Sequence, residues 1–264
     1  MTPQEGITRL KAWFEEYVHQ FASDDPRIQE NIDLKAGHTR RVCLAILDIG
    51  ASLHLSEEDL CLAEATAWLH DMGRFEQYTR YGTFMDHRSE DHAALGVRVI
   101  REHRVLERMG AFDPDIVLNV VGAHNKATLP EELNERTVFF LKLLRDADKI
   151  DIWHVVTAYY RSPQDQESHA IELDLPDQPH ISETVYEALM NGRLVRMADL
   201  KTLDDFKLLQ MGWIYDVNFP RTFQIVRAKG YLEQIRDALT CISSRSSDLY
   251  HRARSFLDHR CTEG

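Results

Sequence analysis

The sequence predicts an all-α fold, and three observations support this prediction. Apolar residues recur with a helical period in nearly every patterned segment, no segment alternates between apolar and polar residues as a strand does, and helix-starting residues precede several of the periodic segments. The chain has 264 residues, 44% of them hydrophobic and 28% charged, so it can bury a sizeable core. We expect a single all-helical domain over residues 1–264.

Apolar periodicity and start signals predict the first three helices. The apolar face of the first helix comprises Ile7, Leu10, Phe14, Tyr17, Val18 and Phe21. A second helix follows Pro26. Ser56, with Asp59 three residues later, is typical of a helix start, so a third helix is expected from there to His70, where Gly73 ends it.

Two segments further along the chain lack the helical pattern. Residues 73–88 have no helical period and are predicted to be a loop, as is the polar stretch 162–181, which contains three prolines. The remaining helices are expected from Ser89 through Leu106, from Pro114 to about His124, from about Glu135 through DADKIDIWHVV, over 182–191, 200–215 and 221–229, and as a final pair from Tyr231.

The charge balance excludes two classes of partner. Lys and Arg number 31 against 43 Asp and Glu, which gives a net charge of −12. An acidic chain is poorly suited to bind duplex nucleic acid or an anionic membrane surface, because phosphate contacts need a basic face. A local basic pocket for a small phosphorylated ligand is compatible with this charge.

The sequence carries no signal for export or membrane insertion. The start MTPQEGITRL lacks a basic segment followed by an apolar core, and no apolar run approaches 18 residues. The four cysteines, Cys43, Cys61, Cys241 and Cys261, lie far apart and form no CxxC pair, which is typical of reduced thiols. We therefore expect a cytoplasmic protein.

Histidines and aspartates recur at predicted helix ends and on apolar helix faces. They are His38 on the second helix, His70 and Asp71 at the end of the third, His92 in the first turn of the fourth, His124 at the end of the fifth, and Asp146 and Asp148 in the sixth. Any one of these histidines is most simply a satisfied core or surface residue, and a chain this rich in His and Asp contains about one His-Asp pair by chance. Buried imidazoles and carboxylates are nevertheless costly unless they are paired, protonated or bound to metal. The whole set indicates a metal site in a helical bundle, with ligands that suit Fe, Mn, Ni, Co or Zn.

Five segments of the chain resemble the HD superfamily of metal-dependent phosphohydrolases. They are GHTRRV (37–42), WLHDMGRF (68–75), DHAALGVRVI (91–100), VVGAHNK (120–126) and RDADKIDI (145–152). The resemblance covers about residues 30–160 and implies an HD-type bundle there, with a helical extension over about 182–260. The segment MGWIYDVNFPRTF (211–223) is similar to the C-terminal part of uncharacterised bacterial members.

The resemblance implies a first metal bound by His38, His70, Asp71 and one aspartate of the DAD segment. Family members usually have Ala-Asp, then two residues, then a polar residue. The segment ADKID matches this pattern with Asp148 as its first aspartate, so the resemblance favours Asp148. Asp146 is the rival, because residues two apart on a helix point about 200° apart and cannot easily both face one ion.

The two-metal branch of the superfamily, which includes cyclic-dinucleotide phosphodiesterases, implies a second metal. That branch has one more histidine after the HD loop and another a helix later, and His92 and His124 match these in order. Asp71 would then bridge the two ions. The GYP segment that marks the cyclic-dinucleotide enzymes is absent from the sequence, so that substrate is not implied.

The resemblance further implies hydrolysis of a nucleotide or another small phosphate ester. One or two divalent ions per chain, with Mg as a further candidate, would activate water and neutralise phosphoryl oxygens. Asp71 and Arg74 are the expected catalytic residues. Arg74 follows the motif where relatives carry a cation and would bind phosphate, although it could equally be a surface residue. Lys126 and Lys149 are weaker candidates for substrate binding.

Two other functions fit the same residues. The ligand set also resembles HD-type diiron oxygenases such as myo-inositol oxygenase, which cleave C–C or C–P bonds with O₂, and ligand types alone do not separate the two activities. A non-catalytic, nucleotide-sensing helical module is the third interpretation. Tyr78, Tyr81 and Phe84 could stack on a base or sugar, or pack the predicted loop. Substrate, metal identity, the number of ions and oligomeric state are left open.

Overall fold

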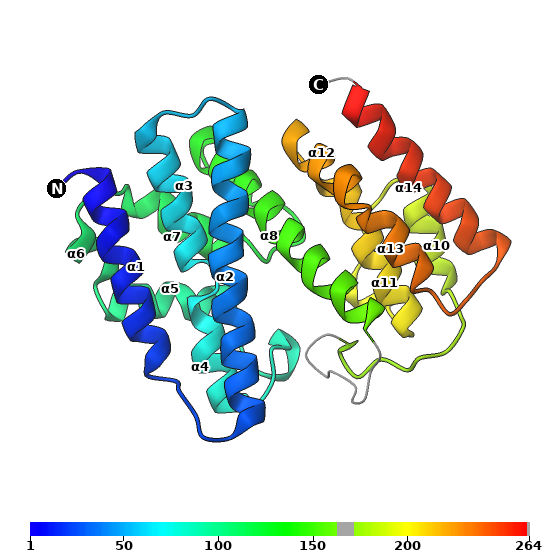
Figure 1. Cartoon of the computed structure of the whole chain (residues 1–264), viewed down its shortest axis with the longest axis horizontal. Helices are drawn as coiled ribbons and strands as arrows, with labels where there is room; N and C mark the ends of the chain where they lie inside the picture. Colours follow the sequence, from blue (N-terminus) through cyan, green and yellow to red (C-terminus); the bar gives the residue numbers. More distant parts are fainter. Residues whose placement is uncertain (163–171, 263–264) are drawn as a thin grey trace. The chain divides into compact units, whose positions relative to one another are not determined.

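Capping side chains begin the first helices of the protein. The caps are Thr2 at α1 (Pro3–His19), Asp25 at α2 (Pro26–Ser52) and Ser56 at α3 (Glu57–Leu69). The computed structural model describes residues 1–162 and 172–262, and within these ranges all regular structure is helical (Figure 1). The predicted all-α fold is confirmed. None of the described helices is long and apolar enough to cross a membrane.

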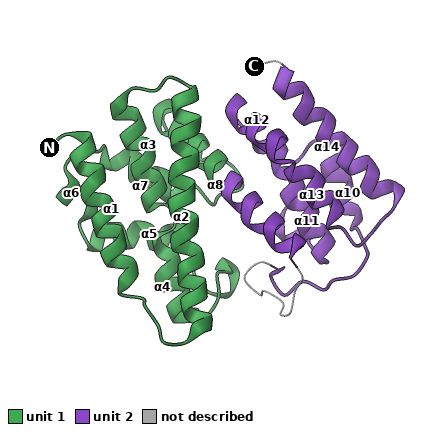
Figure 2. Cartoon of the chain, viewed as in Figure 1, with its two compact units in different colours: residues 1–148 green, residues 149–264 purple. Residues whose placement is uncertain are grey.

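The chain divides into two compact units, residues 1–148 and 149–264, and the boundary falls within α8 (Glu135–Arg161) (Figure 2). The first unit also contains α4 (Met72–Tyr81), the 3₁₀ helix η1 (Asp86–Arg88), α5 (His92–Glu102), α6 (Val105–Met109) and α7 (Pro114–Ala123). The second contains α10 (Glu183–Met190), η2 (Met197–Asp199), α11 (Leu203–Gly212), η3 (Trp213–Asp216), α12 (Pro220–Lys229), α13 (Tyr231–Asp237) and α14 (Ser244–Thr262). The expected single domain stays a prediction, because compactness does not show whether the units unfold together.

Helix α3 is the central helix of the first unit. Every residue from Cys61 to Leu69 is buried, and α3 packs against α1, α2 and α7. Many of its side chains are small, which lets neighbouring helices cover it on several sides. The residues that follow it, His70 and Asp71, therefore start inside the unit instead of on its surface.

Helices α4 and α5 approach closely through glycine. A Cβ atom at Gly73 would lie 2.2 Å from the carbonyl oxygen of His92 and 2.7 Å from the amide nitrogen of Gly96. Only a residue without a side chain permits this approach. The contact holds the first turn of α4 beside the first turn of α5.

The predicted loop over residues 73–88 is wrong, because α4 occupies most of it. The helix is rich in polar residues and buries a short face that includes Met72, Phe75 and Gln77, and it packs against α5 and α2. Gly73 accordingly lies in the first turn of α4 and does not end α3. Residues 163–171 of the second predicted loop lie outside the described part of the chain.

The predicted fourth helix also differs from the structure. Its cap is Asp91, whose side chain accepts hydrogen bonds from two amides of the first turn, and not Ser89. The helix ends at Glu102, and a separate α6 begins after Arg104, whose φ of +52° breaks the helical path. The local pattern located the helix and missed its interruption.

The second unit is built around α11, which is buried along its whole length. Two carboxylates of this helix bind the backbone of surrounding segments. Asp204 accepts hydrogen bonds from the amides of Thr240 and Cys241, and Asp205 accepts one from the amide of Ser182. These buried charges are satisfied by the fold itself, which gives them a structural role.

Candidate metal centre

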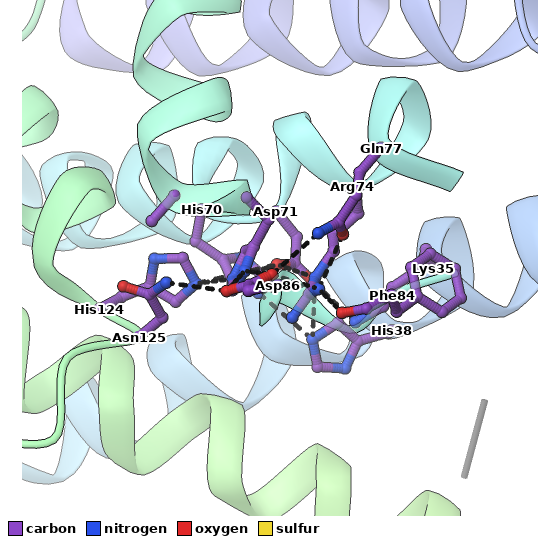
Figure 3. A network of polar contacts seen from close by, with 12 residues as sticks. Lys35, His38, His70, Asp71, Arg74, Gln77, Phe84, Asp86, His124 and Asn125 are labelled. Atoms are coloured by element: carbon purple, nitrogen blue, oxygen red, sulfur yellow. Dashed lines mark hydrogen bonds and ion pairs between the residues drawn. The ribbon is translucent and has the colours of Figure 1, made fainter. Parts of the chain in front are cut away.

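Five buried side chains from different helices and helix junctions meet inside the first unit. His38 lies on α2, His70 follows α3, Asp71 precedes α4, His92 begins α5 and His124 follows α7. None of the five is more than 7% exposed. Figure 3 shows the labelled members of this cluster converging on Asp71. The structure thus brings together residues that the sequence predicted as ligands.

Asp71 lies at the centre of the cluster. Its Oδ2 lies 3.6 Å from the Nε2 of His38 and 3.7 Å from that of His70. Its Oδ1 lies 3.6 Å from the Nε2 of His92 and 3.8 Å from that of His124. Each carboxylate oxygen faces one pair of imidazoles, so two groups of three residues that could hold an ion share Asp71.

In the imidazole pair of His92 and His124, each ring carries its proton on Nδ1, so the two Nε2 lone pairs face each other. His124 Nδ1 lies 2.7 Å from the carbonyl oxygen of Val121, which can only accept, so Nδ1 carries the proton. His92 Nδ1 lies 2.8 Å from an Asp86 carboxylate oxygen and is protonated for the same reason. The two bare Nε2 atoms lie 3.1 Å apart. A cation between them would replace this repulsion by attraction, so the donor set fits a metal ion.

The other imidazole pair has an additional carboxylate. His70 Nδ1 lies 2.7 Å from the carbonyl oxygen of Ala67, so its Nε2 is bare as well, and that Nε2 lies 3.2 Å from His38 Nε2. Asp148 Oδ1 lies 3.1 Å from His38 Nε2 and 3.9 Å from His70 Nε2. Of the two rival aspartates, Asp148 contacts both imidazoles, and Asp146 is fully buried in the same helix.

Burial and neighbouring charges set the protonation of the cluster. Burial lowers the pKa of His70 and of His92 to about 4, so both imidazoles are neutral near pH 7. Burial alone would raise the pKa of the Asp71 carboxyl, but the nearby Lys35 and the imidazoles hold it well below its usual range. Burial likewise opposes ionisation of Asp148, but the hydrogen bond from His38 and the charges of His38 and His70 together lower its pKa. Neutral imidazoles and ionised carboxylates are the forms that bind metal.

Asp86 orients His92, and sequence analysis does not identify it. Its carboxylate accepts hydrogen bonds from His92 Nδ1 at 2.8 Å, from Gln77 Nε2 at 2.8 Å and from Asn125 Nδ2 at 3.3 Å. Burial opposes its ionisation, yet the bond from His92 keeps its pKa low. Asp86 is the first residue of η1, six residues before His92, a spacing that no helical or strand period singles out.

Lys35 is a second residue of the site that sequence analysis does not identify. Its Nζ lies 2.8 Å from Asp71 Oδ2, and 18% of its side chain is exposed. Lys35 precedes His38 by three residues on α2, so the two share a helix face. That spacing is the signal in the sequence that could have found it.

Arg74 lies at the cluster and is not a surface residue. Its Nη1 donates hydrogen bonds to Gln77 Oε1 at 2.8 Å and to Asp86 Oδ1 at 3.2 Å, and its Nε lies 3.5 Å from Asp71 Oδ1. Only 15% of its side chain is exposed. Arg74 is therefore not an exposed surface arginine, and its role in substrate binding stays a prediction.

The two weaker cationic candidates are engaged by other carboxylates. Lys126 Nζ lies 2.5 Å from Asp91 Oδ2, with nearly half of the lysine side chain exposed. Lys149 Nζ lies 2.7 Å from Asp216 Oδ2 within the second unit, and Lys149 is buried. Their role in substrate binding stays a prediction.

The fold and the cluster together define a class of protein. It is an all-α domain that gathers histidines and aspartates from several helices around one shared aspartate, in groups that could hold a metal ion. The family model described as the HD domain matches residues 36–153, which contain all the clustered histidines and aspartates, so this stretch of the chain is an HD domain. Comparison with curated proteins and with solved structures found no match.

Proposed function

We propose that the protein is a metal-dependent phosphohydrolase that acts on a nucleotide or another small phosphate ester. The observation that carries this proposal is the shared Asp71 carboxylate, each of whose oxygens faces one pair of buried imidazoles. Members of the HD-domain superfamily are typically metal-dependent phosphohydrolases, which supports the same reaction class.

The ligands divide into two sets that meet at Asp71. One ion would be held by His38, His70, Asp71 and Asp148, and a second by Asp71, His92 and His124. Fe, Mn, Ni, Co, Zn and Mg are the candidate ions. When bound, they supply the Lewis acidity that lowers the pKa of water and neutralises phosphoryl oxygens.

The residues around the ligands orient them and bind the substrate. Asp86 fixes the ring and the tautomer of His92, so that its Nε2 lone pair points to Asp71. The buried Nε of Arg74 has no hydrogen-bond acceptor among residues 1–162 and 172–262. A phosphate oxygen is the acceptor that a guanidinium at this position would bind.

The proposal is tested by a hydrolysis panel with Mn²⁺ or Fe²⁺ added. The panel contains nucleoside mono-, di- and triphosphates and one model diester, assayed with the wild type and with Asp71→Ala. We expect metal-dependent phosphate release by the wild type alone, with the variant retaining its helical circular dichroism. Full activity of Asp71→Ala would contradict the assignment of the site.

The same panel separates the proposal from the oxygenase alternative. A wild-type protein that binds two irons per chain, hydrolyses nothing in the panel and consumes O₂ with an added substrate would be an oxygenase of the diiron type. A protein that binds nucleotide and catalyses neither reaction would be a sensing module.

A further inference from the structure

Two cations flank Asp71 and share one aromatic ring. Lys35 Nζ contacts Asp71 Oδ2 at 2.8 Å, and Arg74 Nε lies 3.5 Å from Oδ1. The centre of the Phe84 ring lies 5.4 Å from Lys35 Nζ and 5.8 Å from Arg74 Cζ, within the range of cation–π attraction. Figure 3 shows Lys35, Phe84 and Arg74 on the side of Asp71 away from His124 and Asn125. The ring thus holds two positive charges beside the same carboxylate.

Lys35 contacts the Asp71 oxygen that the first set of ligands also needs. Oδ2 faces His38 and His70, so an ion held by these imidazoles would compete with the ammonium for the same oxygen. A lysine carries its charge on a flexible four-carbon stem, and a small rotation at its end exchanges one anion for another. An ammonium displaced from Asp71 would need a new anion close to Phe84 and Arg74.

The net charge of the groups around Asp71 favours one kind of anion. Lys35 and Arg74 contact Asp71. Two further carboxylates contact imidazoles of the cluster: Asp86 contacts His92 and Asp148 contacts His38. These five charged groups sum to −1, and two divalent ions would bring the sum to +3. A site with this excess of positive charge favours a phosphoryl group with two negative charges over a diester with one.

We propose that Lys35 is a substrate-binding residue that, together with Arg74, binds a dianionic phosphoryl group when the centre is loaded with metal. The substrate class is then a phosphate monoester or a terminal phosphate. This inference rests on the proposed function of the site. Lys35 lies one residue before the segment that the family model matches, so the family resemblance does not supply it.

The test measures binding of inorganic phosphate and of dimethyl phosphate to the Mn²⁺-loaded full chain by titration calorimetry. Lys35→Met removes the charge and keeps most of the stem. Lys11→Met is the matched control, because Lys11 also pairs with a carboxylate, Glu64 at 2.7 Å, and lies 5.9 Å from an aromatic ring, that of Trp68. We expect Lys35→Met to weaken phosphate binding at least tenfold and to change dimethyl phosphate binding little, with Lys11→Met unchanged.

Metal affinity distinguishes this role from simple neutralisation of Asp71. If Lys35 leaves Asp71 on loading, Lys35→Met binds Mn²⁺ at least as tightly as the wild type while its phosphate affinity falls. Unchanged phosphate affinity in a metal-loaded Lys35→Met protein would overturn the inference and leave the proposed hydrolase intact. A metal-loaded wild type that neither binds phosphate nor hydrolyses any ester of the panel would overturn both the inference about Lys35 and the proposed hydrolase function.

A measurement on the unmodified protein covers the case in which Lys35→Met does not fold. Lysine acetylation is followed by mass spectrometry with and without Mn²⁺ and phosphate. We expect Mn²⁺ to raise the reactivity of Lys35 and phosphate to lower it again at least threefold, with Lys11 unaffected. Equal reactivity of Lys35 under all conditions would overturn the inference.

Discussion

At the scale of single residues, the site depends on which nitrogen of each imidazole carries the proton. In His92 and in His124 the Nδ1 donates to an oxygen, so the two Nε2 lone pairs are left 3.1 Å apart. The oxygens that hold these rings, Asp86 and the Val121 carbonyl, therefore decide where the metal-binding atoms point. Of these two acceptors, the Asp86 carboxylate belongs to a side chain, so its effect on the His92 ring can be tested by substitution.

The change Asp86→Ala should weaken metal binding by roughly 10- to 100-fold, because His92 loses the acceptor that fixes its ring and tautomer. Isothermal titration with Mn²⁺ measures the effect. Glu90→Ala is the control, since Glu90 belongs to the same segment and its carboxylate pairs with Arg98 on the surface. Wild-type affinity in Asp86→Ala would show that the ring is held by other contacts.

Substitutions of Asp148 and of Asp146 should differ in their effects on metal affinity. The carboxylate of Asp148 contacts His38 and His70, so Asp148→Asn should lower the affinity for the first ion at least tenfold. Asp146→Asn should leave metal affinity unchanged. Metal titrations of both variants measure these affinities. A larger loss of affinity in Asp146→Asn than in Asp148→Asn would assign Asp146 as the ligand.

At the scale of elements, the contact between α4 and α5 positions two of the ligands. Asp71 occupies the N-cap position of α4 with φ −104° and ψ 18°, and its side chain makes no capping hydrogen bond there. His92 is the first residue of α5. Gly73 allows the two first turns to touch. The sequence analysis predicted a loop where α4 lies, because this helix of ten residues is rich in polar side chains, and its packing against α5 and α2 stabilises it.

Gly73→Ala should therefore destabilise the protein and weaken metal binding together. The added Cβ would lie 2.2 Å from the His92 carbonyl oxygen, so backbone must shift, at a cost of about 1–3 kcal/mol in the free energy of unfolding. Urea denaturation of the metal-free protein measures the stability. In the control Gly122→Ala the nearest atom, of Val97, lies at 3.4 Å, and no destabilisation is expected. Equal stability of the two variants would contradict the close contact.

At the scale of the whole molecule, α8 contributes core side chains to both compact units. Phe140 and Leu144 are buried in the first unit, and Trp153 is buried in the second, where its Nε1 donates to the carbonyl oxygen of Gln210. One helix of 27 residues thus belongs to two cores. Its continuity is the physical basis for expecting the chain to unfold as one domain.

Metal binding should accordingly stabilise the whole chain. An ion at 100 times its Kd adds about 2.7 kcal/mol per site to the free energy of unfolding, provided the unfolded chain does not bind it. We expect a single thermal transition that shifts to lower temperature with a chelator, and no shift for Asp71→Ala. Two transitions in calorimetry, of which the chelator moves one, would show two domains.

The sequence by itself determined the features that depend on neighbouring residues. Helical periodicity and caps such as Ser56 located most helices. The polar residues at helix ends and on apolar helix faces included the members of the His–Asp cluster. The resemblance of short motifs then ordered these residues into a ligand set, which stays a prediction for each ion. Local physical chemistry suffices for this, because a cap or a helical face involves residues three or four apart.

Only the tertiary structure decided which distant groups surround the cluster. The contacts of Lys35 with Asp71 and of Asp86 with His92 depend on how α2, α4 and α5 pack, and the pairing of Lys149 with Asp216 joins residues far apart in the chain. Hydrogen bonds and ion pairs act over a few ångströms in space regardless of sequence separation. The partners of a buried charge are therefore set by packing, and the pattern of one chain does not display them.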